Sequence, residues 1–357
     1  MKVLHCPTDT GGNAWGLSRA ERKLGIHSDV MVRRADSREY PHDIDLRLRS
    51  GWWPSRAYRL VKFLVGAARE YDVFHFNWGM TLFDYWLWNV NCLELPLLKR
   101  MGKRIVVTFQ GCDARMKTWS RTHLATSACQ ECDVRWCTER VDQIRQARIK
   151  KIFFYADQVF ALNPDLLHFL PGAEFLPYAS VDATEWVPSQ NTGSWKHGTR
   201  PLRMLHLPTN RSIKGTRYIE AACERLRQDG FAVELTVVEN APHARVRELI
   251  EATDVVVDQL LIGWYGAVAV EAMALEKPVF CYLREEDLKR FVPFHEQIPI
   301  LRTTKETLAD DVRGFMMNGS EGREIGAAGR AFVRRYHDPL QIARRTILAY
   351  GHSPSRG

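Results

Sequence analysis

The sequence contains no apolar run of about 18–20 residues, the length that an α-helix needs to cross a bilayer. Its longest apolar stretches are interrupted by charge, as Tyr58–Ala68 is by Arg59 and Lys62. The first residues, Met1–Pro7, are too few and too polar for a secretory leader. No low-complexity tract occurs, which excludes a mainly disordered chain. We therefore expect a folded cytoplasmic protein whose 8 cysteines are mostly reduced thiols or metal ligands.

The composition is that of an ordinary globular protein, with 45% hydrophobic and 26% charged residues. The 357 residues are too many for one ordinary core, and about 100–200 residues per domain predict two domains. The net charge of +8 and the pI near 9.1 favour anionic partners such as nucleotides, phosphorylated substrates, acidic lipids or nucleic acid. The same charge fits basic side chains spread singly over solvated faces, and charge alone leaves both interpretations open.

Short apolar strands separated by helical patterns occur in two series, which predicts an α/β fold with two Rossmann-like, doubly wound domains. Ligands of such sheets bind outside the carboxyl ends of the strands, and two such domains that face each other form a central cleft. The first series lies at Lys2–Cys6, Ser28–Arg33, Tyr71–Phe76, Arg104–Phe109, Gln158–Leu162 and Glu174–Leu176. The second series lies at Leu202–Leu207, Ala232–Val238, Asp254–Gln259 and Pro278–Tyr282.

The polar, turn-rich stretch of residues 186–200 separates the two series and predicts a linker. We therefore expect an N-terminal domain over residues 1–185 and a C-terminal domain over residues 201–335. Residues of about 112–140 form a polar, cysteine-containing insertion in the first domain. Residues 336–357 are expected to form a C-terminal helix that packs back on the N-terminal domain.

Two segments that follow predicted strands carry glycines or basic side chains suited to an anion. Gly11 and Gly12 let backbone amides approach a ligand at the start of a helix, although a Gly-Gly pair alone is more often only a turn. Asn210–Gly215 follows the first strand of the second domain, where Arg211 offers a planar fork to phosphate and Lys214 a point charge. The alternative for this segment is a solvated basic loop, which its position between a strand and a helix disfavours.

A third segment, Gly263–Ala274, follows the predicted strand at Asp254–Gln259. Gly266 permits a tight turn, and the small Ala267 lets a phosphate oxygen approach the free amides at the start of a helix. Glu271 lies just over one turn further on, inside an otherwise apolar run, and its carboxylate suits the hydroxyls of a ribose. The alternative, a buried helix with one capping glutamate, leaves this position of a glutamate unexplained.

These segments resemble, in order along nearly the whole chain, the motifs of retaining GT-B glycosyltransferases of family four. Glu271-Ala272-Met273-Ala274 and Lys277-Pro278-Val279 resemble the nucleotide-sugar-binding motif of that family. Arg211 and Lys214-Gly215 look like its diphosphate-binding pair, with a shorter gap than usual. Thr108–Asp113 resembles the Thr-x-His-Gly-x-Asp segment of its N-terminal domain, and the Gly-Gly turn resembles its opening glycine loop.

The resemblance implies a GT-B fold and transfer of a sugar from a nucleotide-sugar donor, UDP- or GDP-linked, to a glycan, lipid-linked or small-molecule acceptor. The C-terminal domain would bind the donor, and the N-terminal domain would hold the acceptor. The departing diphosphate of a retaining transfer takes the acceptor proton, so the protein mainly stabilises phosphate charge. The assigned residues are, for catalysis, Asp113, Arg211 and Lys214; for the donor, Gly11, Gly12, Arg211, Lys214, Tyr265, Gly266, Ala267 and Glu271; and for the acceptor, His75 and Gln110, with Asp9 as a weaker candidate.

Two departures from the family pattern bear on activity. The first acidic residue of the family's Glu-x7-Glu motif, which contacts hydroxyls of the donor sugar, is replaced by Gly263. The family's active-site His is Gln110, which can hydrogen-bond a sugar but cannot act as an acid or base. Both departures favour the alternative of a catalytically degenerate GT-B protein that binds sugar or nucleotide as a partner subunit. Sugar-nucleotide epimerisation in the same pocket is a further alternative.

Cysteines in the predicted insertion have the spacing of metal ligands. Cys129 and Cys132 form a Cys-x-x-Cys pair, Cys137 follows, and Cys112 or His123 would complete a tetrahedral structural zinc site. The alternative is a set of unconnected reduced thiols. No cofactor is expected to be required for the sugar transfer itself.

The segment Gly51–Phe63 mixes tryptophan and tyrosine with arginine and lysine. Such a helix can lie on an acidic membrane surface, as peripheral enzymes that act on lipid-linked acceptors do. A core helix with a basic outer face is the alternative, and the sequence favours it. No zinc-finger, aromatic-platform or helix-turn-helix pattern supports binding to nucleic acid. The expected location is therefore cytoplasmic, with peripheral contact at the inner membrane face as the alternative.

Overall fold

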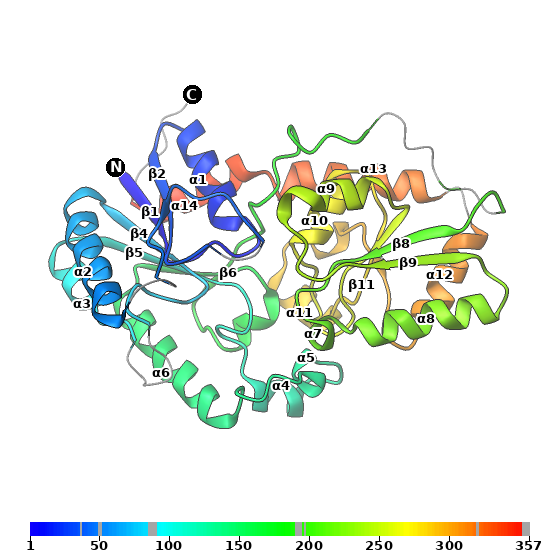
Figure 1. Cartoon of the computed structure of the whole chain (residues 1–357), viewed down its shortest axis with the longest axis horizontal. Helices are drawn as coiled ribbons and strands as arrows, with labels where there is room; N and C mark the ends of the chain where they lie inside the picture. Colours follow the sequence, from blue (N-terminus) through cyan, green and yellow to red (C-terminus); the bar gives the residue numbers. More distant parts are fainter. Residues whose placement is uncertain are drawn as a thin grey trace. The chain divides into compact units, whose positions relative to one another are not determined.

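The computed structural model describes residues 1–35, 38–48, 52–84, 91–189, 195, 198–318 and 321–351. The chain divides into two compact units (Figure 1). Unit 1 is formed by Met1–Lys117, Trp136–Ser180 and Pro339–Gly357, and unit 2 by Thr118–Arg135 and Val181–Asp338. Each unit therefore combines segments that are far apart in the sequence.

The sheet of unit 1 has seven strands in the order β3-β2-β1-β4-β5-β6-β7. Every described pairing is parallel, and Val3 of β1 lies opposite Ser28 on one side and Val73 on the other. The order reverses between β1 and β4, so the carboxyl ends of these strands flank the place where ligands bind in doubly wound sheets. The strands are β1 (Lys2–Cys6), β2 (His27–Val32), β3 (Ile44–Asp45), β4 (Val73–Asn77), β5 (Arg104–Phe109), β6 (Gln158–Ala161) and β7 (Glu174–Phe175).

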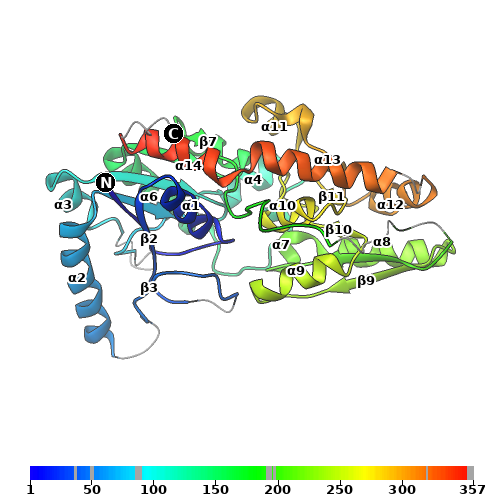
Figure 2. The same ribbon diagram turned by 90° about the horizontal axis from the view of Figure 1, so that it is seen from above.

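The apolar core of unit 1 joins the first and last of the described helices, α1 and α14. Val3, Val73 and Phe160 of the sheet pack in one cluster with Leu17 of α1 and Ile347 of α14. Helices α1 and α14 lie side by side in both views (Figures 1 and 2). The helices are α1 (Asn13–Lys23), α2 (Trp53–Glu70), α3 (Leu95–Arg100), α6 (Glu139–Tyr155) and α14 (Pro339–Ala349), with a 3₁₀ turn, η2, at Pro164–His168.

A buried polar network also ties the end of α14 to unit 1. Glu21 of α1 is fully buried and accepts hydrogen bonds from the hydroxyls of Ser28 (2.7 Å) and Tyr350 (2.8 Å). Nε2 of His5 lies 2.9 Å from the same carboxylate. Because a buried carboxylate costs free energy unless it is paired, these contacts stabilise the position of the C-terminal helix.

The sheet of unit 2 has five strands in the order β12-β11-β10-β8-β9, and every described pairing is again parallel. The order reverses between β8 and β10. The strands are β8 (Leu202–His206), β9 (Val233–Val237), β10 (Val255–Val257), β11 (Val279–Cys281) and β12 (Leu301–Arg302). The helices are α4 (Lys117–His123), α5 (Ala128–Glu131), α7 (Arg211–Lys214), α8 (Thr216–Gln228), α9 (His243–Glu251), α10 (Ala267–Ala274), α11 (Glu285–Phe291), α12 (Leu308–Met317) and α13 (Glu321–Tyr336), with a 3₁₀ turn, η3, at His295–Gln297.

Residues 118–135 pack in unit 2, although both flanking segments belong to unit 1. Arg284 donates a hydrogen bond to the carbonyl of Thr126 (2.8 Å), and the hydroxyl of Ser212 donates to Asp133 (2.7 Å). Glu131 of the same segment pairs with basic side chains of unit 2. The predicted insertion is therefore corrected, because most of it joins the second unit through these polar contacts rather than the N-terminal domain.

The two doubly wound sheets confirm the predicted α/β class, and every predicted strand is present. β3 and β12, of two residues each, were not predicted, whereas the equally short β7 was. The first boundary between the units falls after Ser180 rather than after residue 185, and the residues from Pro339 belong to unit 1. Of the predicted linker, residues 186–189, 195 and 198–200 belong to unit 2, whereas residues 190–194, 196 and 197 lie outside the described residues.

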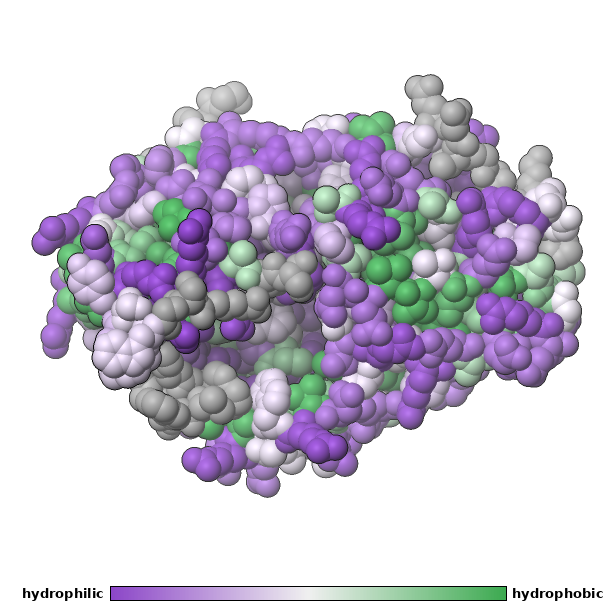
Figure 3. Space-filling view, in the orientation of Figure 1, coloured by the Kyte–Doolittle hydropathy of each residue, from purple (hydrophilic) through white to green (hydrophobic). Residues whose placement is uncertain are grey.

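None of the described helices combines the length and the apolar character that crossing a bilayer requires. The longest of them, α2, has 18 residues and carries Arg59 and Lys62 in its middle. The face drawn in Figure 3 is mainly hydrophilic, with apolar residues in smaller areas between the polar ones.

Candidate functional site

Two loops of unit 2 leave neighbouring strands at the point where the strand order reverses. β8 and β10 pair directly and in parallel, with Met204 opposite Val255. The loop after β8 leads into α7 at Arg211, and the loop after β10 leads into α10 at Ala267. Because the carboxyl ends of parallel strands meet at one edge of a sheet, the two predicted donor-binding segments lie together there.

Lys214 and the start of α10 are joined by the carboxylate of Asp258. Lys214 Nζ donates to Oδ1 (2.7 Å), and the backbone amide of Gly266 donates to Oδ2 (2.5 Å). Asp258 is buried, and Lys214 is nearly so. The carbonyl of Lys214 also accepts a hydrogen bond from the amide of Leu260 (3.1 Å), which holds the two loops together. An ammonium group and a helix N-terminus therefore converge on one anionic group.

Small residues at the start of α10 keep its N-terminus accessible. Gly266 has an ordinary backbone conformation (φ −103°), so the absence of a side chain matters here through space. A Cβ at this position would lie 3.3 Å from Oδ2 of Asp258 and 3.5 Å from Nζ of Lys214. Ala267 is only half-buried. The free amides of the first turn thus lie beside the Lys214 ammonium, in an arrangement that suits a phosphate.

Asp258 was not singled out from the sequence, because it falls within the predicted strand Asp254–Gln259. β10 ends at Val257, so Asp258 is the first residue beyond the strand. An acidic residue directly after a fully buried Val-Val-Val strand, in a sheet whose ligands bind at that edge, is the signal that identifies it.

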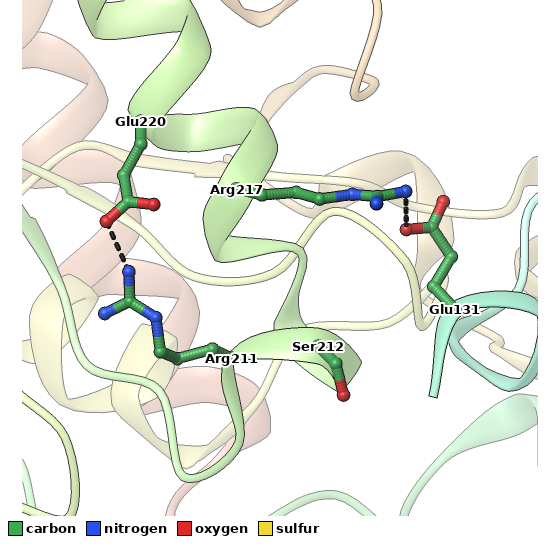
Figure 4. A pocket seen from close by; sticks show the side chains of 5 residues that line it. All are labelled: Glu131, Arg211, Ser212, Arg217 and Glu220. Atoms are coloured by element: carbon green, nitrogen blue, oxygen red, sulfur yellow. Dashed lines mark hydrogen bonds and ion pairs between the residues drawn. The ribbon is translucent and has the colours of Figure 1, made fainter. Parts of the chain in front are cut away.

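Arg211 pairs with carboxylates of its own unit. It forms an ion pair with Glu220 and donates a hydrogen bond to Glu239 (3.2 Å). These hydrogen bonds raise the pKa of the guanidinium above its ordinary value. Figure 4 shows Arg211 turned towards Glu220, and Arg217 turned towards Glu131. The pocket between them is lined by Glu131, Arg211, Ser212, Arg217 and Glu220. A diphosphate bound by Arg211 would have to replace these carboxylates.

Glu271 is buried in α10 and has a partner within unit 2. Its Oε1 lies 3.1 Å from Nε2 of His243, the first residue of α9. This contact accounts for a glutamate in an apolar helix. A ribose hydroxyl at Glu271 would share the carboxylate with His243, so the predicted ribose contact stays a prediction.

Tyr265 lies in the core of unit 2. It is fully buried, its hydroxyl lies 2.8 Å from Nε2 of His337, and its ring stacks on Trp264 with 4.0 Å between the ring centroids. Phe332 of α13 contacts the same ring edge-on. Both the ring and the hydroxyl are occupied inside the unit, so the predicted contact of Tyr265 with the donor is corrected: the residue anchors the end of α13.

The position of the missing acidic residue, Gly263, is filled from a neighbouring element. Gly263 has a left-handed backbone (φ +88°), and a Cβ there would approach the Arg284 side chain to 2.9 Å. The buried guanidinium of Arg284 donates to Asp287 (2.7 Å) and to the carbonyl of Ile262 (3.2 Å). An acidic side chain at this position would collide with Arg284 unless Arg284 moved.

The Gly-Gly turn in unit 1 connects β1 to α1. Gly11 and Gly12 both have φ of 67°, in the left-handed region that favours glycine. A Cβ on Gly12 would lie 3.3 Å from the ring of Tyr40. Asp9 accepts a hydrogen bond from the amide of Ala14 (2.9 Å) at the start of α1. This acidic residue therefore holds a helix N-terminus, as Asp258 does in unit 2.

The turn after β5 contains Gln110 and Asp113. The Asp113 carboxylate accepts hydrogen bonds from the amides of Gln110 (2.9 Å), Gly111 (2.6 Å) and Ala114 (3.2 Å). Burial raises the pKa of Asp113, against the effect of these amides. Its position therefore argues against the predicted catalytic role, because the carboxylate shapes the turn. Gln110 is 7% exposed, and its Nε2 has no hydrogen-bond partner within the described part of the chain, so its amide group is available to a ligand.

His75 lies inside the sheet of unit 1 rather than at its edge. The side chain is fully buried in β4, with Nδ1 2.7 Å from the hydroxyl of Tyr350 and Nε2 2.7 Å from the hydroxyl of Thr108. Burial, followed by the neighbouring His5, lowers the pKa of His75 well below its ordinary range. The predicted contact with an acceptor is corrected, because both ring nitrogens have partners in the core.

The four cysteines of the predicted zinc site divide between the units. Cys112 and Cys137 belong to unit 1, and Cys129 and Cys132 to unit 2; all are half-buried, and none is in a disulfide. An arginine of unit 1, Arg145, donates to the sulfur of Cys137 (3.3 Å). Among the residues with described positions, no group of three or more His, Cys, Asp or Glu side chains is arranged to hold a metal. Structural zinc therefore stays a prediction, which metal analysis of the purified protein tests.

No protein-family model and no characterised sequence matches the chain. Solved structures nevertheless match it over nearly its whole length. Sucrose-phosphate synthase from Thermosynechococcus elongatus superposes with a TM-score of 0.62 at 16% identity, over 98% of this chain and 98% of that one. HepE from Anabaena, in complex with UDP-glucose, superposes with a TM-score of 0.61 at 12% identity, over 98% and 99%. The UDP-GlcNAc 2-epimerase from Neisseria meningitidis, bound to UDP-GlcNAc, gives a TM-score of 0.51 at 11% identity, over 98% and 99%.

The chain has the GT-B fold. The predicted fold class is thereby confirmed in its two parts, the doubly wound α/β sheets and the GT-B arrangement of elements along the chain. Sequence identities of 11–16% make this a likeness of fold. The function must be argued from the site.

Proposed function

We propose that the chain is a glycosyltransferase that transfers a sugar from a nucleotide-sugar donor to a glycan, lipid-linked or small-molecule acceptor, with retention of the anomeric configuration. The observation that carries the proposal is the convergence of Lys214 and the amide of Gly266, the residue that caps α10, on the buried carboxylate of Asp258. An ammonium group and a helix N-terminus are also the groups that bind phosphate. The UDP-glucose of HepE and the UDP-GlcNAc of the epimerase, both proteins of similar fold, support a nucleotide sugar as the ligand.

The donor diphosphate, in this proposal, lies against the Lys214 ammonium and the amide of Ala267 at the start of α10. Asp258 is a positioning residue, because it holds Lys214 beside the start of α10. Arg211 exchanges its carboxylate partners for a phosphate oxygen when the donor binds. The charge that the diphosphate brings is then shared among an ammonium, a guanidinium and the helix N-terminus.

The proposed transfer asks little of side-chain bases. The bond between the anomeric carbon and the phosphate oxygen breaks, the acceptor oxygen attacks the same face, and the acceptor proton passes to the departing phosphate. The protein stabilises the negative charge that grows on the diphosphate. The occupied surroundings of Asp113 and His75 support a mechanism that uses neither of them as a base.

A thermal-shift screen with UDP, GDP, ADP, CMP and TDP is the first test, because a ligand that binds only the folded state raises the melting temperature of the protein. We expect UDP or GDP to raise it, and Lys214→Met to abolish the shift. Incubation of the matching nucleotide sugars with acceptors, followed by NMR of the product, then reports the anomeric configuration. The proposal fails if no nucleotide stabilises the protein, and its stereochemical part fails if the product is inverted.

Two other functions use the same nucleotide site. Sugar-nucleotide epimerisation is favoured by the likeness to UDP-GlcNAc 2-epimerase. It is recognised by a change of sugar configuration in UDP-GlcNAc without any acceptor. A catalytically degenerate binding subunit is favoured by Gly263 and Gln110, which stand where the family has an acidic residue and a histidine. Such a subunit binds the nucleotide sugar and leaves it unconsumed.

A further inference from the structure

Helix α2 presents large apolar side chains to solvent. Trp52 and Trp53, at its N-terminal end, are 76% and 70% exposed, and Tyr58 is 66% exposed. Val61 and Val65 are exposed as well, and with Tyr58 they follow a spacing of three and four residues. This spacing places the three side chains on one face of the helix. Gly51, which precedes the two tryptophans, lies outside the described residues.

The opposite face of α2 already provides the packing that the fold needs. Leu60, Leu64, Ala67 and Ala68 are buried in unit 1. A surface helix of a globular protein normally carries polar residues on its outer face. The outer apolar stripe of α2 is therefore unexplained by folding. The sequence-based preference for a core helix with a basic outer face accounts for the buried inner side and for the exposed charges, but not for this stripe. Figure 2 shows α2 at the edge of unit 1, extending away from the sheet.

The charges on α2 are almost all positive. Arg56, Lys62 and Arg69 are exposed, and Lys62 and Arg69 lie on the same outer face as Tyr58 and Val65 by their spacing. The helix has one acidic residue, at its last position, and that residue pairs with Lys2 (3.1 Å). The outer face thus presents tryptophan, tyrosine and valine side chains between lysine and arginine side chains. It is complementary to a surface that has anionic groups on the outside and apolar groups beneath them.

We propose that α2 docks unit 1 on a membrane surface rich in anionic lipids. The indole rings of Trp52 and Trp53 enter the headgroup region, where the apolar ring and the polar N–H are both accommodated. Lys62 and Arg69 contact the phosphates of the lipid headgroups, and Val61 and Val65 face the start of the acyl chains. The contact is peripheral, since α2 stays packed on unit 1 through its inner face. The inference does not depend on the glycosyltransferase proposal, and a bilayer is also where lipid-linked acceptors are found.

The test is co-sedimentation of the full chain with vesicles of phosphatidylcholine alone and of phosphatidylcholine mixed with phosphatidylglycerol. We expect binding to the anionic vesicles only, weakened by salt because the lipid charge is then screened. The double variant Trp52→Ala/Trp53→Ala and the double variant Lys62→Glu/Arg69→Glu should each lose about tenfold in apparent affinity. Their melting temperatures should stay unchanged, because these side chains are exposed.

Matched controls come from α6 of the same unit. Phe154 is 80% exposed and Lys150 is also exposed, so Phe154→Ala and Lys150→Glu remove an aromatic ring and a positive charge from another surface. Both should bind vesicles like the unmodified chain. Equal binding to neutral and anionic vesicles, or equal losses in the α6 and α2 variants, overturns the proposal. So does self-association that depends on Trp52 and Trp53, because the face is then an interface with a second copy. Nucleotide thermal shifts should be unchanged in all variants, which separates this test from the donor site.

Discussion

Lys214 and Asp258 form a buried ion pair whose loss should affect stability and nucleotide binding differently. Lys214→Met leaves the Asp258 carboxylate buried with one amide partner, which should destabilise unit 2 by about 3 kcal/mol. Adding Asp258→Asn removes the uncompensated charge and should restore much of that stability. The nucleotide thermal shift should remain absent in both variants. Urea denaturation of the single and double variants measures the first effect; a double variant no more stable than Lys214→Met contradicts it.

A comparison of Gly263 with Gly230, also in unit 2, separates the cost of a left-handed backbone from the cost of steric crowding. Gly263 and Gly230 have φ of +88° and +85°, but only Gly263 has a side chain, that of Arg284, within reach of a new Cβ. Gly230→Ala should therefore cost about 1 kcal/mol, the cost of a left-handed alanine. Gly263→Ala should cost about 1–3 kcal/mol more, because Arg284 must move. The two changes in the free energy of unfolding, measured in urea, should differ accordingly; equal values would show that Arg284 yields freely.

The β8–α8 segment should make unit 2 sensitive to acid. His206 of β8 is buried, with Nδ1 2.8 Å from the carbonyl of Val257 and Nε2 2.9 Å from the hydroxyl of Thr216, the first residue of α8. Burial lowers the pKa of His206 from 6.5 to about 4. As the pH falls, His206 is protonated in the unfolded chain before it is protonated in the folded chain. The contribution of the neutral, buried His206 to the free energy of unfolding is therefore complete above pH 6.5 and is lost between pH 6.5 and about pH 4.

The free energy of unfolding should fall by about 3 kcal/mol because of His206 alone, since one pKa unit corresponds to about 1.36 kcal/mol. Urea denaturation at a series of pH values measures the total slope. NMR titration of the His206 ring isolates this residue: its resonance should not shift between pH 7.5 and 5.5. A titration midpoint near 6.5 in the folded protein would exclude the effect.

Helices and strands could be predicted where the pattern of their own residues determines the secondary structure. Apolar runs bounded by turns identified the long strands, and the rule for parallel sheets correctly brought Lys214 and Gly266 to one edge. Asp258 was missed because the end of a three-residue strand cannot be placed to within one residue from its pattern. The strands β3 and β12 were missed; each pairs with one longer neighbour at an outer edge of its sheet.

The partners of buried polar side chains were not predictable, because they come from distant parts of the chain. The partner of His75 on Nδ1 is Tyr350, 275 residues further on, and that of Tyr265 is His337, 72 residues further on. A polar residue in an apolar segment is visible in the sequence, whereas its partner is fixed by the fold. This is why His75 and Tyr265 were interpreted as ligand-binding residues although both belong to cores.

The whole chain should tolerate truncation only up to the end of α14. Removing residues 352–357 leaves every described contact of α14 in place, and the protein should remain soluble with an unchanged melting temperature. Removing residues 339–357 uncovers Leu17 and the apolar core around α1 and deprives Glu21 of Tyr350, so unit 1 should fail to fold cooperatively. Solubility and circular-dichroism melting compare the two; a soluble, cooperatively melting chain without α14 would contradict this expectation.

The passage of the chain between units has a consequence for biosynthesis. Unit 1 begins with the first strand and is closed by α14, whereas all residues of unit 2 have been made once Asp338 is reached. Domains generally fold as units, in the order in which a ribosome completes them. Here the order is inverted: all of unit 2 is available for folding first, and the sheet of unit 1 waits with the apolar side of α1 uncovered until α14 has been made.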